Sequence, residues 1–224
     1  MKRLLLLSLV ALSGASLVRA EVTRADVVTR IETCEAILEG FQRGPHAIPP
    51  QVLQKAQAIV IVNQFKGAFL LGIKDGYGAI LVRKPNGRWS LPVLVNAGEA
   101  SLGLQVGANA VETVYVINDP KVPRLLFKHR FNVGVDATAV AGPKVAETER
   151  LNREILDAPV LVYTKSAGLF AGATVKAGHL SRSDSSNFLL HNTRYTMPEL
   201  LYGDFVQPVP EVQPLMGLVE KLTR

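Results

Sequence analysis

The fold of this chain is decided by residues 58–95, which read AIVIVNQFKGAFLLGIKDGYGAILVRKPNGRWSLPVLV. Short β-branched or aromatic runs alternate in this stretch with Gly, Pro and Asn, a pattern typical of strands joined by turns. Lys84-Pro85-Asn86-Gly87 is a tight-turn signal between two of these runs. Several glycines fall inside the strand runs, where they let a sheet bend or let another backbone approach closely. The stretch therefore predicts antiparallel strands in a small barrel-like or strongly coiled sheet.

Residues 23–41, which precede this sheet, predict an amphipathic helix. Their apolar side chains recur at spacings of four, three, four and three, which places them on one helical face: Val27, Ile31, Cys34, Leu38 and Phe41. Thr23 or Asp26 can cap the helix, and Gly40 can end it. Proline is preorganised for a first helical turn, so Pro49-Pro50 predicts the start of a second, short helix.

The remainder of the chain predicts more strands followed by helices. Strand patterns occur at 112–117, 131–140, 159–164 and 169–180, and helical patterns occur at 121–130, 184–191, 197–203 and 212–224. Residues 142–157 are polar and predict a loop or a solvated helix. The predicted fold class is therefore α+β and β-rich, with a coiled antiparallel sheet flanked by N- and C-terminal helices in one domain.

Composition excludes several classes of protein. Of 224 residues, 48% are hydrophobic and only 20% are charged, a balance that provides a core and excludes a mostly disordered chain. A single cysteine excludes an intrachain disulfide framework and a cysteine-based zinc site. No apolar run in the body of the chain reaches the roughly 18 residues that a membrane span needs.

Residues 1–20 carry the pattern of a secretory signal peptide. Lys2 and Arg3 precede a short apolar run, and cleavage is expected after Ala20. We therefore expect a periplasmic or secreted protein. We expect no lipid anchor, because a lipoprotein needs a cysteine at the cleavage point and the lone Cys34 lies well inside the first helix. Loss of three basic residues with this segment lowers the formal charge from +6 to +3. That excess is too small for a nucleic-acid binder.

Motifs for catalysis or cofactors are not found in the sequence. The glycines at 72, 76, 78, 103 and 107 do not have the order of a dinucleotide or phosphate loop. The four histidines, His46, His129, His179 and His191, lack metal-ligand spacing. We therefore expect no enzyme activity, no metal and no cofactor. A Ser-His-Asp hydrolase stays as a remote alternative, since its members need no fixed spacing.

The basic residues form two clusters with few acids among them. The first comprises Lys66, Lys74, Arg83, Lys84 and Arg88, and the second comprises Lys121, Arg124, Lys128 and Arg130. If both clusters meet on one face, they form a binding surface for anionic lipid, since each such residue contributes on the order of 1 kcal/mol near an anionic membrane. The alternative is that these residues are ordinary solvated charges.

Several strings together resemble the SYLF-domain family, also called the Ysc-type actin-binding or lipid-binding domain. They include AQAIVIVNQFKGAFLLG (56–72), DGYGAILVRKPNGRWSLP (75–92), GVDATAVAGP (134–143) and YTKSAGLFAGATVKAG (163–178). The most specific pieces are Arg83 to Pro92 and Lys165 to Gly172. The resemblance covers nearly all of residues 21–224 and identifies them as one SYLF-type domain.

The resemblance implies a β-rich barrel-like core with flanking helices and a role in membrane binding. In this family the binding is attributed to an N-terminal amphipathic helix and a cationic patch, and some eukaryotic members bind phosphoinositides or actin. For an exported chain the implied partner is anionic phospholipid or a membrane surface of the bacterial envelope. The alternative is an envelope protein-interaction or structural module, in which glycine-containing strands and an apolar C-terminal tail dock a protein partner.

Overall fold

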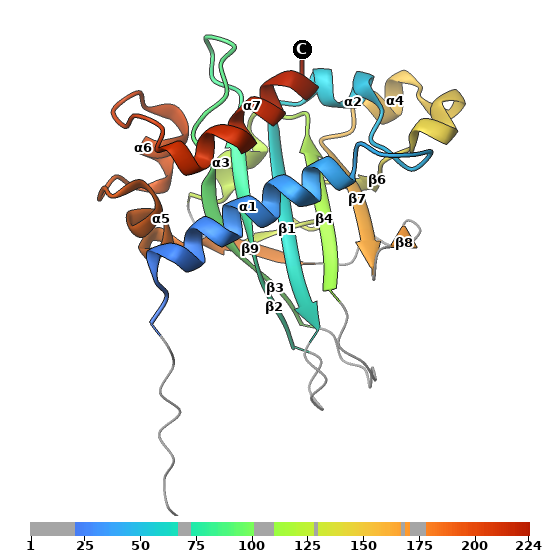
Figure 1. Cartoon of the computed structure of the whole chain (residues 1–224). Coiled ribbons are helices and arrows are strands. Elements are labelled where there is room, and N and C mark those ends of the chain that lie inside the picture. Colours follow the sequence, from blue (N-terminus) through green and yellow to red (C-terminus); the bar gives the residue numbers. More distant parts are fainter. Residues whose placement is uncertain (1–20, 67–72, 101–109, 128–129, 167–168, 171–177) are drawn as a thin grey trace, which may run out of the picture.

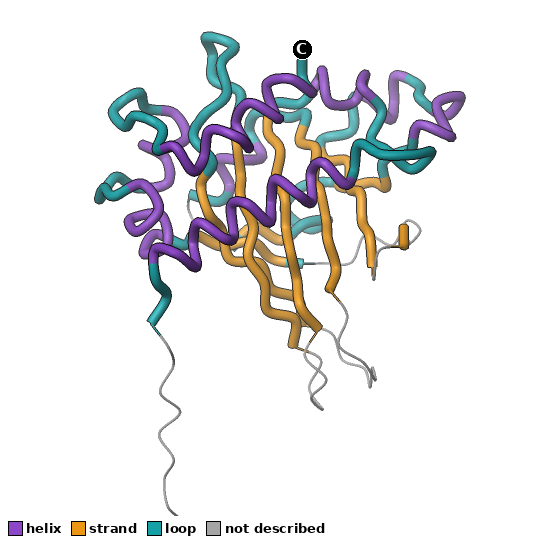
Figure 2. Tube along the Cα trace, viewed as in Figure 1, coloured by secondary structure: helices purple, strands orange, loops and turns teal. Residues whose placement is uncertain are grey.

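The structure is a computed structural model that describes residues 21–66, 73–100, 110–127, 130–166, 169–170 and 178–224. One strongly curled sheet forms the body of the molecule, and helices cover one of its faces and one of its ends (Figures 1 and 2). The α+β half-barrel with flanking N- and C-terminal helices confirms the predicted fold class. The predicted signal peptide, residues 1–20, lies outside the described residues.

The sheet places β1 at its centre. Its strands are β1 (Ala58–Lys66), β2 (Ile73–Val82), β3 (Val93–Ala100), β4 (Ala110–Ile117), β5 (Phe131–Asn132), β6 (Ala139–Ala141), β7 (Val160–Ser166), β8 (Leu169–Phe170) and β9 (His179–Arg182). Their order is β5-β9-β3-β2-β1-β4-β7-β6, and β8 pairs with β7. The central strands pair antiparallel as predicted, but β6 and β7 run parallel.

Glycine permits the tight approach of β2 to β1. The two strands pair from Ala58 opposite Val82 to Lys66 opposite Lys74. A side chain at Gly78 would collide with the carbonyl oxygen of Ile61 on β1. This close backbone approach is what glycine inside the strand runs predicts. The predicted tight turn after β2 is also present, with Gly87 at a φ of +80° and its N–H donating to the Lys84 carbonyl oxygen at 2.9 Å.

The helices lie mostly at the two ends of the chain. They are α1 (Arg24–Gly40), α2 (Pro50–Lys55), α3 (Val122–Leu125), α4 (Arg153–Leu156), α5 (Asp184–His191), α6 (Met197–Tyr202) and α7 (Gln213–Leu222), with 3-10 turns η1 (Val145–Arg150) and η2 (Pro210–Val212). Thr23 caps α1 as predicted, in a reciprocal capping box with Asp26. α1 crosses β1 and β2 and also contacts α5 and α7 (Figure 1).

The predicted apolar face of α1 forms part of the core. Val27, Ile31, Cys34 and Leu38 are fully buried. Burial raises the pKa of the Cys34 thiol to about 12, so the side chain is an inert thiol at neutral pH. The C-terminal helix α7 also packs against α1, and its Leu215 is fully buried. The apolar C-terminal tail is therefore largely committed to the core rather than free to dock a partner.

The predicted strand at 131–140 is wrong in its middle. Only Phe131–Asn132 and Ala139–Ala141 pair as strands, β5 with β9 and β6 with β7. Between them Gly134 has a φ of +83°, and Asp136 accepts a hydrogen bond from the Asn132 N–H at 2.7 Å. A glycine in the left-handed region together with an aspartate bonded to a nearby backbone N–H makes a turn. The β-branched residues of this segment obscured the turn in the sequence.

Candidate functional site

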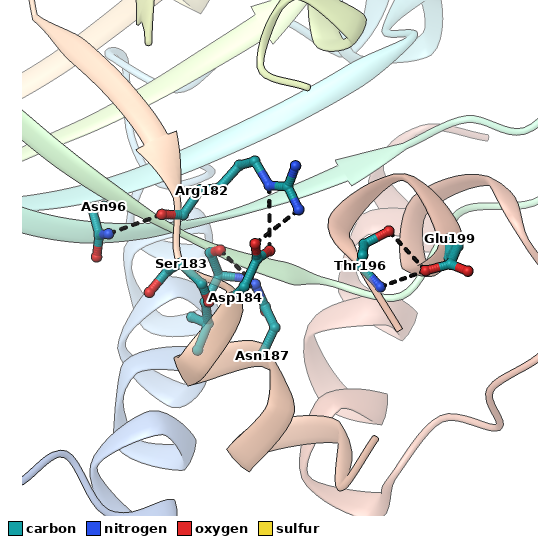
Figure 3. Close-up of polar contacts among 8 residues, drawn as sticks. Asn96, Arg182, Ser183, Asp184, Asn187, Thr196 and Glu199 are labelled. Carbon is teal, nitrogen blue, oxygen red and sulfur yellow. Dashed lines mark hydrogen bonds and ion pairs between the residues drawn. The ribbon is translucent and has the colours of Figure 1, made fainter. Parts of the chain in front are cut away.

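The helix α5 is fixed to the sheet by its polar residues. The Asn187 side-chain amide donates to the Leu94 carbonyl oxygen at 2.9 Å, and its Oδ1 accepts from the Leu94 N–H at 2.7 Å. The same amide donates to the Ser183 carbonyl oxygen (Figure 3). In contrast, Phe188 and Leu189 of α5 are exposed. The helix therefore turns its amide toward β3 and leaves apolar side chains in solvent.

The segment after α5 presents an aromatic pair. Tyr195 and Phe205 stack with ring centroids 5.6 Å apart and an interplanar angle of 22°. They flank α6, whose N-terminus is closed by a capping box between Thr196 and Glu199 (Figure 3). Phe205 is 69% exposed, which is unusual for phenylalanine in a protein with a large core. An exposed aromatic pair on an anchored segment is a candidate contact for a partner.

Cations from both basic clusters contact α6 or the residues directly after it. Lys84 donates to the Gly203 carbonyl oxygen at 2.6 Å and to Asp204 Oδ1 at 2.8 Å, and the guanidinium of Arg88 lies 3.5 Å from the same oxygen. Arg124, from the second cluster, lies over the Tyr202 ring at 4.8 Å from its centroid. The hydrogen bond from Lys84 and the nearby charges lower the pKa of Asp204.

We name this region the α6 surface and define it by Lys84, Arg88, Arg124, Tyr195, Asp204 and Phe205. Two of its cations remain accessible, since the Arg88 side chain is 70% exposed and Arg124 is also exposed. Lys84, in contrast, is only 9% exposed and holds the backbone of the segment. Two further exposed charges belong to this segment: Arg194 directly precedes Tyr195, and Glu199 lies within α6, between Tyr195 and Asp204. The α6 surface therefore combines accessible positive charge with accessible aromatic rings.

The other predicted lipid-binding residues are divided over the molecule. Lys121 and Arg130 are exposed on either side of α3, and Lys128 lies outside the described residues. Lys66 and Lys74 are paired in register at the far end of the β1–β2 hairpin. Lys74 and Arg83 are nine positions apart along an extended strand, which corresponds to about 30 Å. The first cluster therefore occupies two ends of the sheet rather than one patch.

The side chain of Arg83 makes its contacts within the fold. Its guanidinium group donates to the carbonyl oxygens of Ala56 at 3.1 Å and Thr223 at 3.2 Å, and lies over the ring of Trp89 at 5.2 Å from its centroid. The Trp89 indole N–H in turn donates to Thr223 Oγ1 at 2.8 Å. These contacts join the end of α2, the β2–β3 turn and the end of α7. Arg83 therefore has partners within the fold for most of its donors.

The N-terminal helix does not offer its apolar face to a membrane in this structure, because that face packs on β1 and β2. Its outer face carries Glu32, Glu35 and Glu39, and burial together with the other two carboxylates raises the pKa of Glu35. Acidic side chains on the exposed face oppose binding to anionic lipid. Of the two elements that the family resemblance implies, the cationic patch has the better support here.

The described residues contain no cluster of three or more His, Cys, Asp or Glu side chains that could hold a metal ion. Within the same part of the chain, no helix is long and apolar enough to cross a membrane. His191 is buried at the end of α5, and its Nε2 lies 2.9 Å from the Pro92 carbonyl oxygen, which makes Nε2 the protonated nitrogen. This histidine therefore bonds a main-chain carbonyl rather than a serine or a carboxylate.

Acidification is expected to destabilise the protein through His191. Burial lowers its pKa below the ordinary value of 6.5, and its buried Nδ1 has no hydrogen-bond partner among the described residues. The unfolded chain therefore binds a proton near pH 6.5 while the folded chain does not, so stability is present above that pH and is lost as pH falls toward the lower folded pKa. The loss approaches about 1.4 kcal/mol per pH unit.

Urea unfolding at a series of pH values measures this effect. His191→Gln should flatten the dependence below about pH 6.5. An unaltered slope in the His191 variant would show that another group is responsible.

Three residues of the α6 surface were missed in the sequence. Tyr195, Asp204 and Phe205 lie in short loops on either side of α6, where no periodic pattern marks them. The only available signal was an aromatic residue directly after Gly203-Asp204, a position where turns are usually polar. That signal could not show that the two rings stack or that basic residues from distant turns join them.

The chain is similar in sequence to known proteins. Residues 98–222 match the Ysc84 family, described as Las17-binding protein actin regulator. The chain is 28% identical to the SH3 domain-containing YSC84-like protein 1 of Xenopus laevis over 81% of its own length and 55% of that protein. It is 30% identical to an SH3 domain-containing protein of Schizosaccharomyces pombe over 72% of its own length and 38% of that protein.

A third relative is the LAS seventeen-binding protein 3 of Saccharomyces cerevisiae, 29% identical over 77% of this chain and 38% of the relative. The chain thus spans about half or less of the length of these curated relatives. The matched region includes β4, β7 and β9 of the sheet, α5 and α6, and the aromatic pair of the α6 surface. The chain belongs to the Ysc84 family, which is the SYLF-domain family that its sequence resembles.

Proposed function

We propose that this chain is a non-catalytic domain that binds anionic phospholipid at a membrane surface of the bacterial envelope. One observation carries the proposal: cations from both basic clusters contact α6 or the residues after it, and an exposed aromatic pair flanks the same helix. Cations near an anionic surface each contribute on the order of 1 kcal/mol. Aromatic rings beside them suit the boundary between headgroups and acyl chains.

The charge pattern supports lipid rather than nucleic acid as the partner. With only +3 after removal of residues 1–20, the chain lacks the strong overall excess of a nucleic-acid binder. The positive charge is concentrated locally, around Arg88 and Arg124. Local charge of this size gives reversible attraction to anionic lipid, which weakens as salt screens it.

The signal-peptide pattern of residues 1–20 supports an envelope location for this contact. We propose export with cleavage after Ala20, so that the lipid encountered is an envelope phospholipid. Protein recovered from the cell envelope after expression with its leader is the material for the binding test. An N-terminus other than Glu21, determined by mass spectrometry, would contradict the proposed cleavage.

Sedimentation with vesicles tests the lipid proposal. The exported protein should sediment with vesicles of anionic phospholipid at low salt and much less with neutral vesicles. Arg88→Glu with Arg124→Glu should weaken binding to anionic vesicles roughly 30-fold or more, since two favourable charges are lost. The matched control is Arg43→Glu with Arg153→Glu, which reverses two exposed arginines on other elements. Equal sedimentation with neutral and anionic vesicles would refute the electrostatic proposal.

The second candidate function is a protein-interaction module. The family description and the name of the yeast relative refer to protein binding. Accessible aromatic and arginine side chains are also enriched at protein interfaces. Co-purification of an envelope protein that survives high salt in the absence of lipid, and is lost with Phe205→Ser, would favour this function over lipid binding.

A further inference from the structure

We propose that Tyr195 and Phe205 insert into the interfacial layer of an anionic bilayer, so that the α6 end of the sheet is the membrane-docking end. This inference rests on the proposed lipid-binding function and specifies where and how the chain meets the lipid. Two ends of the sheet compete for this role. Each has an exposed phenylalanine near basic residues, Phe205 beside Lys84 and Arg88, and Phe65 beside Lys66 and Lys74.

The aromatic pair is held in place by the β2–β3 turn. Lys84 bonds both the carbonyl oxygen of Gly203 and the carboxylate of Asp204, the two residues that precede Phe205. The Phe205 ring lies so close to Gly203 that a side chain there would collide with it. The ring is therefore presented to solvent by an ordered backbone. A preorganised side chain loses little conformational freedom when it enters the membrane interface, which favours binding.

Phe65 has different surroundings at the other end. It is 51% exposed, against 69% for Phe205, and its ring centroid lies 6.3 Å from that of Tyr77 on the neighbouring strand. The register partner of Phe65 is Asp75, and Glu112 lies opposite Asn63, two residues before Phe65. Acidic residues thus lie among the basic residues here, as Glu199 and Asp204 do at the α6 end. The greater exposure of Phe205 and the anchoring of its backbone by Lys84 favour the α6 end as the docking surface.

An anionic bilayer is the occupant that fits the α6 surface. Phe205 and Tyr195 supply apolar area, and the tyrosine hydroxyl can remain hydrated, as amphipathic side chains do at a membrane interface. The exposed Arg88, which contacts Asp204, and the exposed Arg124, which lies over Tyr202 of α6, can meet lipid phosphates. The contact proposed here lies at the interface, and these side chains set its depth.

Fluorescence quenching by brominated lipid tests the docking end. Phe205→Trp and Phe65→Trp each place a reporter at one end of the sheet, and the native Trp89, which is buried, gives a background measured in the unmodified chain. In anionic vesicles with brominated acyl chains, the emission of F205W should shift to shorter wavelength and be quenched. The emission of F65W should remain unquenched.

A second variant measures the contribution of the ring. Phe205→Ser should weaken binding to anionic vesicles about tenfold, the loss expected for partial burial of one aromatic side chain. The matched control is Val135→Ser, because Val135 is 75% exposed in the turn between β5 and β6. Circular dichroism and thermal unfolding confirm that each variant is folded.

The outcomes separate this inference from the proposed function. If the unmodified chain binds anionic vesicles but F65W is quenched instead of F205W, or neither is quenched, the insertion of the α6 surface is refuted while lipid binding stands. If the unmodified chain binds no vesicle at all, both are refuted. Quenching of F205W alone, together with the loss of affinity in F205S, supports the inference.

Discussion

Replacing Asn187 with leucine is expected to lower the free energy of unfolding by about 3–5 kcal/mol. The Asn187 side chain is buried and pairs with both main-chain groups of Leu94 on β3. On this edge of β3 the pairing with β9 begins only at Val95, opposite Arg182. The amide of Asn187 therefore continues the sheet for one more residue. A leucine would leave the N–H and C=O of Leu94 buried without partners, and each such group costs about 1–3 kcal/mol.

Denaturant unfolding of the variant measures this loss. Ser185→Ala, at an exposed position of the same helix, is the control and should change stability by less than about 0.5 kcal/mol. Asn187→Asp gives a second test, since a carboxylate can accept from the Leu94 N–H but repels the carbonyl oxygens of Leu94 and Ser183. Relative to the unmodified chain, N187D should recover stability as pH falls, because its protonated form can donate again. An N187L protein within about 1 kcal/mol of the unmodified one would contradict the role assigned to this amide.

The role of Asn187 could not be predicted because its partner lies 93 positions away. In the sequence, DSSNFLLH predicts a helix with its polar residues near the start, and this helix is present. The usual assumption that apolar side chains face the core holds for Leu190, which is fully buried, but fails for its two apolar neighbours. In the structure Asn187 and His191 face the sheet, while Phe188 and Leu189 are exposed. The main-chain groups of β3 determine the orientation of α5, and no local pattern reports them.

Elements with local determinants were predicted well. The central hairpins follow from alternating runs and the turn around Gly87, and α1 follows from its apolar spacing and the cap at Thr23. Elements that depend on distant pairing were not. The parallel pairing of β6 with β7 joins two segments that carry no local signal of their relative direction. The turn at Gly134 is local, but the β-branched residues around it obscured it in the sequence.

The candidate site, too, could be predicted only in part from the sequence. Composition identified Arg88 and Arg124 as basic residues worth testing, and the structure brings both toward α6. A cluster defined along the sequence can nevertheless be split by a strand, because the two ends of β2 lie about 30 Å apart. Lys74 and Arg88 therefore belong to different ends of the molecule. The position of Phe205 depends on the hydrogen bond from Lys84 to the Gly203 carbonyl oxygen, and these two residues meet only in the folded chain.

Arg83 and Arg88 are expected to respond to mutation in opposite ways, although both lie in the same predicted cluster. Arg83→Met should lower the free energy of unfolding by about 2–4 kcal/mol, since hydrogen bonds from a charged donor contribute about 1.5–3 kcal/mol each and partly survive through water. The guanidinium of Arg83 bonds the carbonyl oxygens of Ala56 and Thr223 and stacks on Trp89. Its loss releases the end of α7 from the β2–β3 turn.

Arg88→Met is the matched control, because Arg88 occupies the same turn, its side chain is 70% exposed, and that side chain forms an ion pair with the exposed Asp204 at 3.5 Å. Its stability should change by less than about 0.5 kcal/mol, as is usual for surface ion pairs. For vesicle binding we expect the opposite: the Arg88 variant should be affected more than the Arg83 variant. R83M, measured well below its unfolding temperature, should bind anionic vesicles like the unmodified chain, whereas R88M should bind about fivefold more weakly, because one accessible charge near the lipid is lost. If R83M were fully stable but failed to bind, Arg83 would contact lipid directly, and the assignment of its guanidinium to the fold would be wrong.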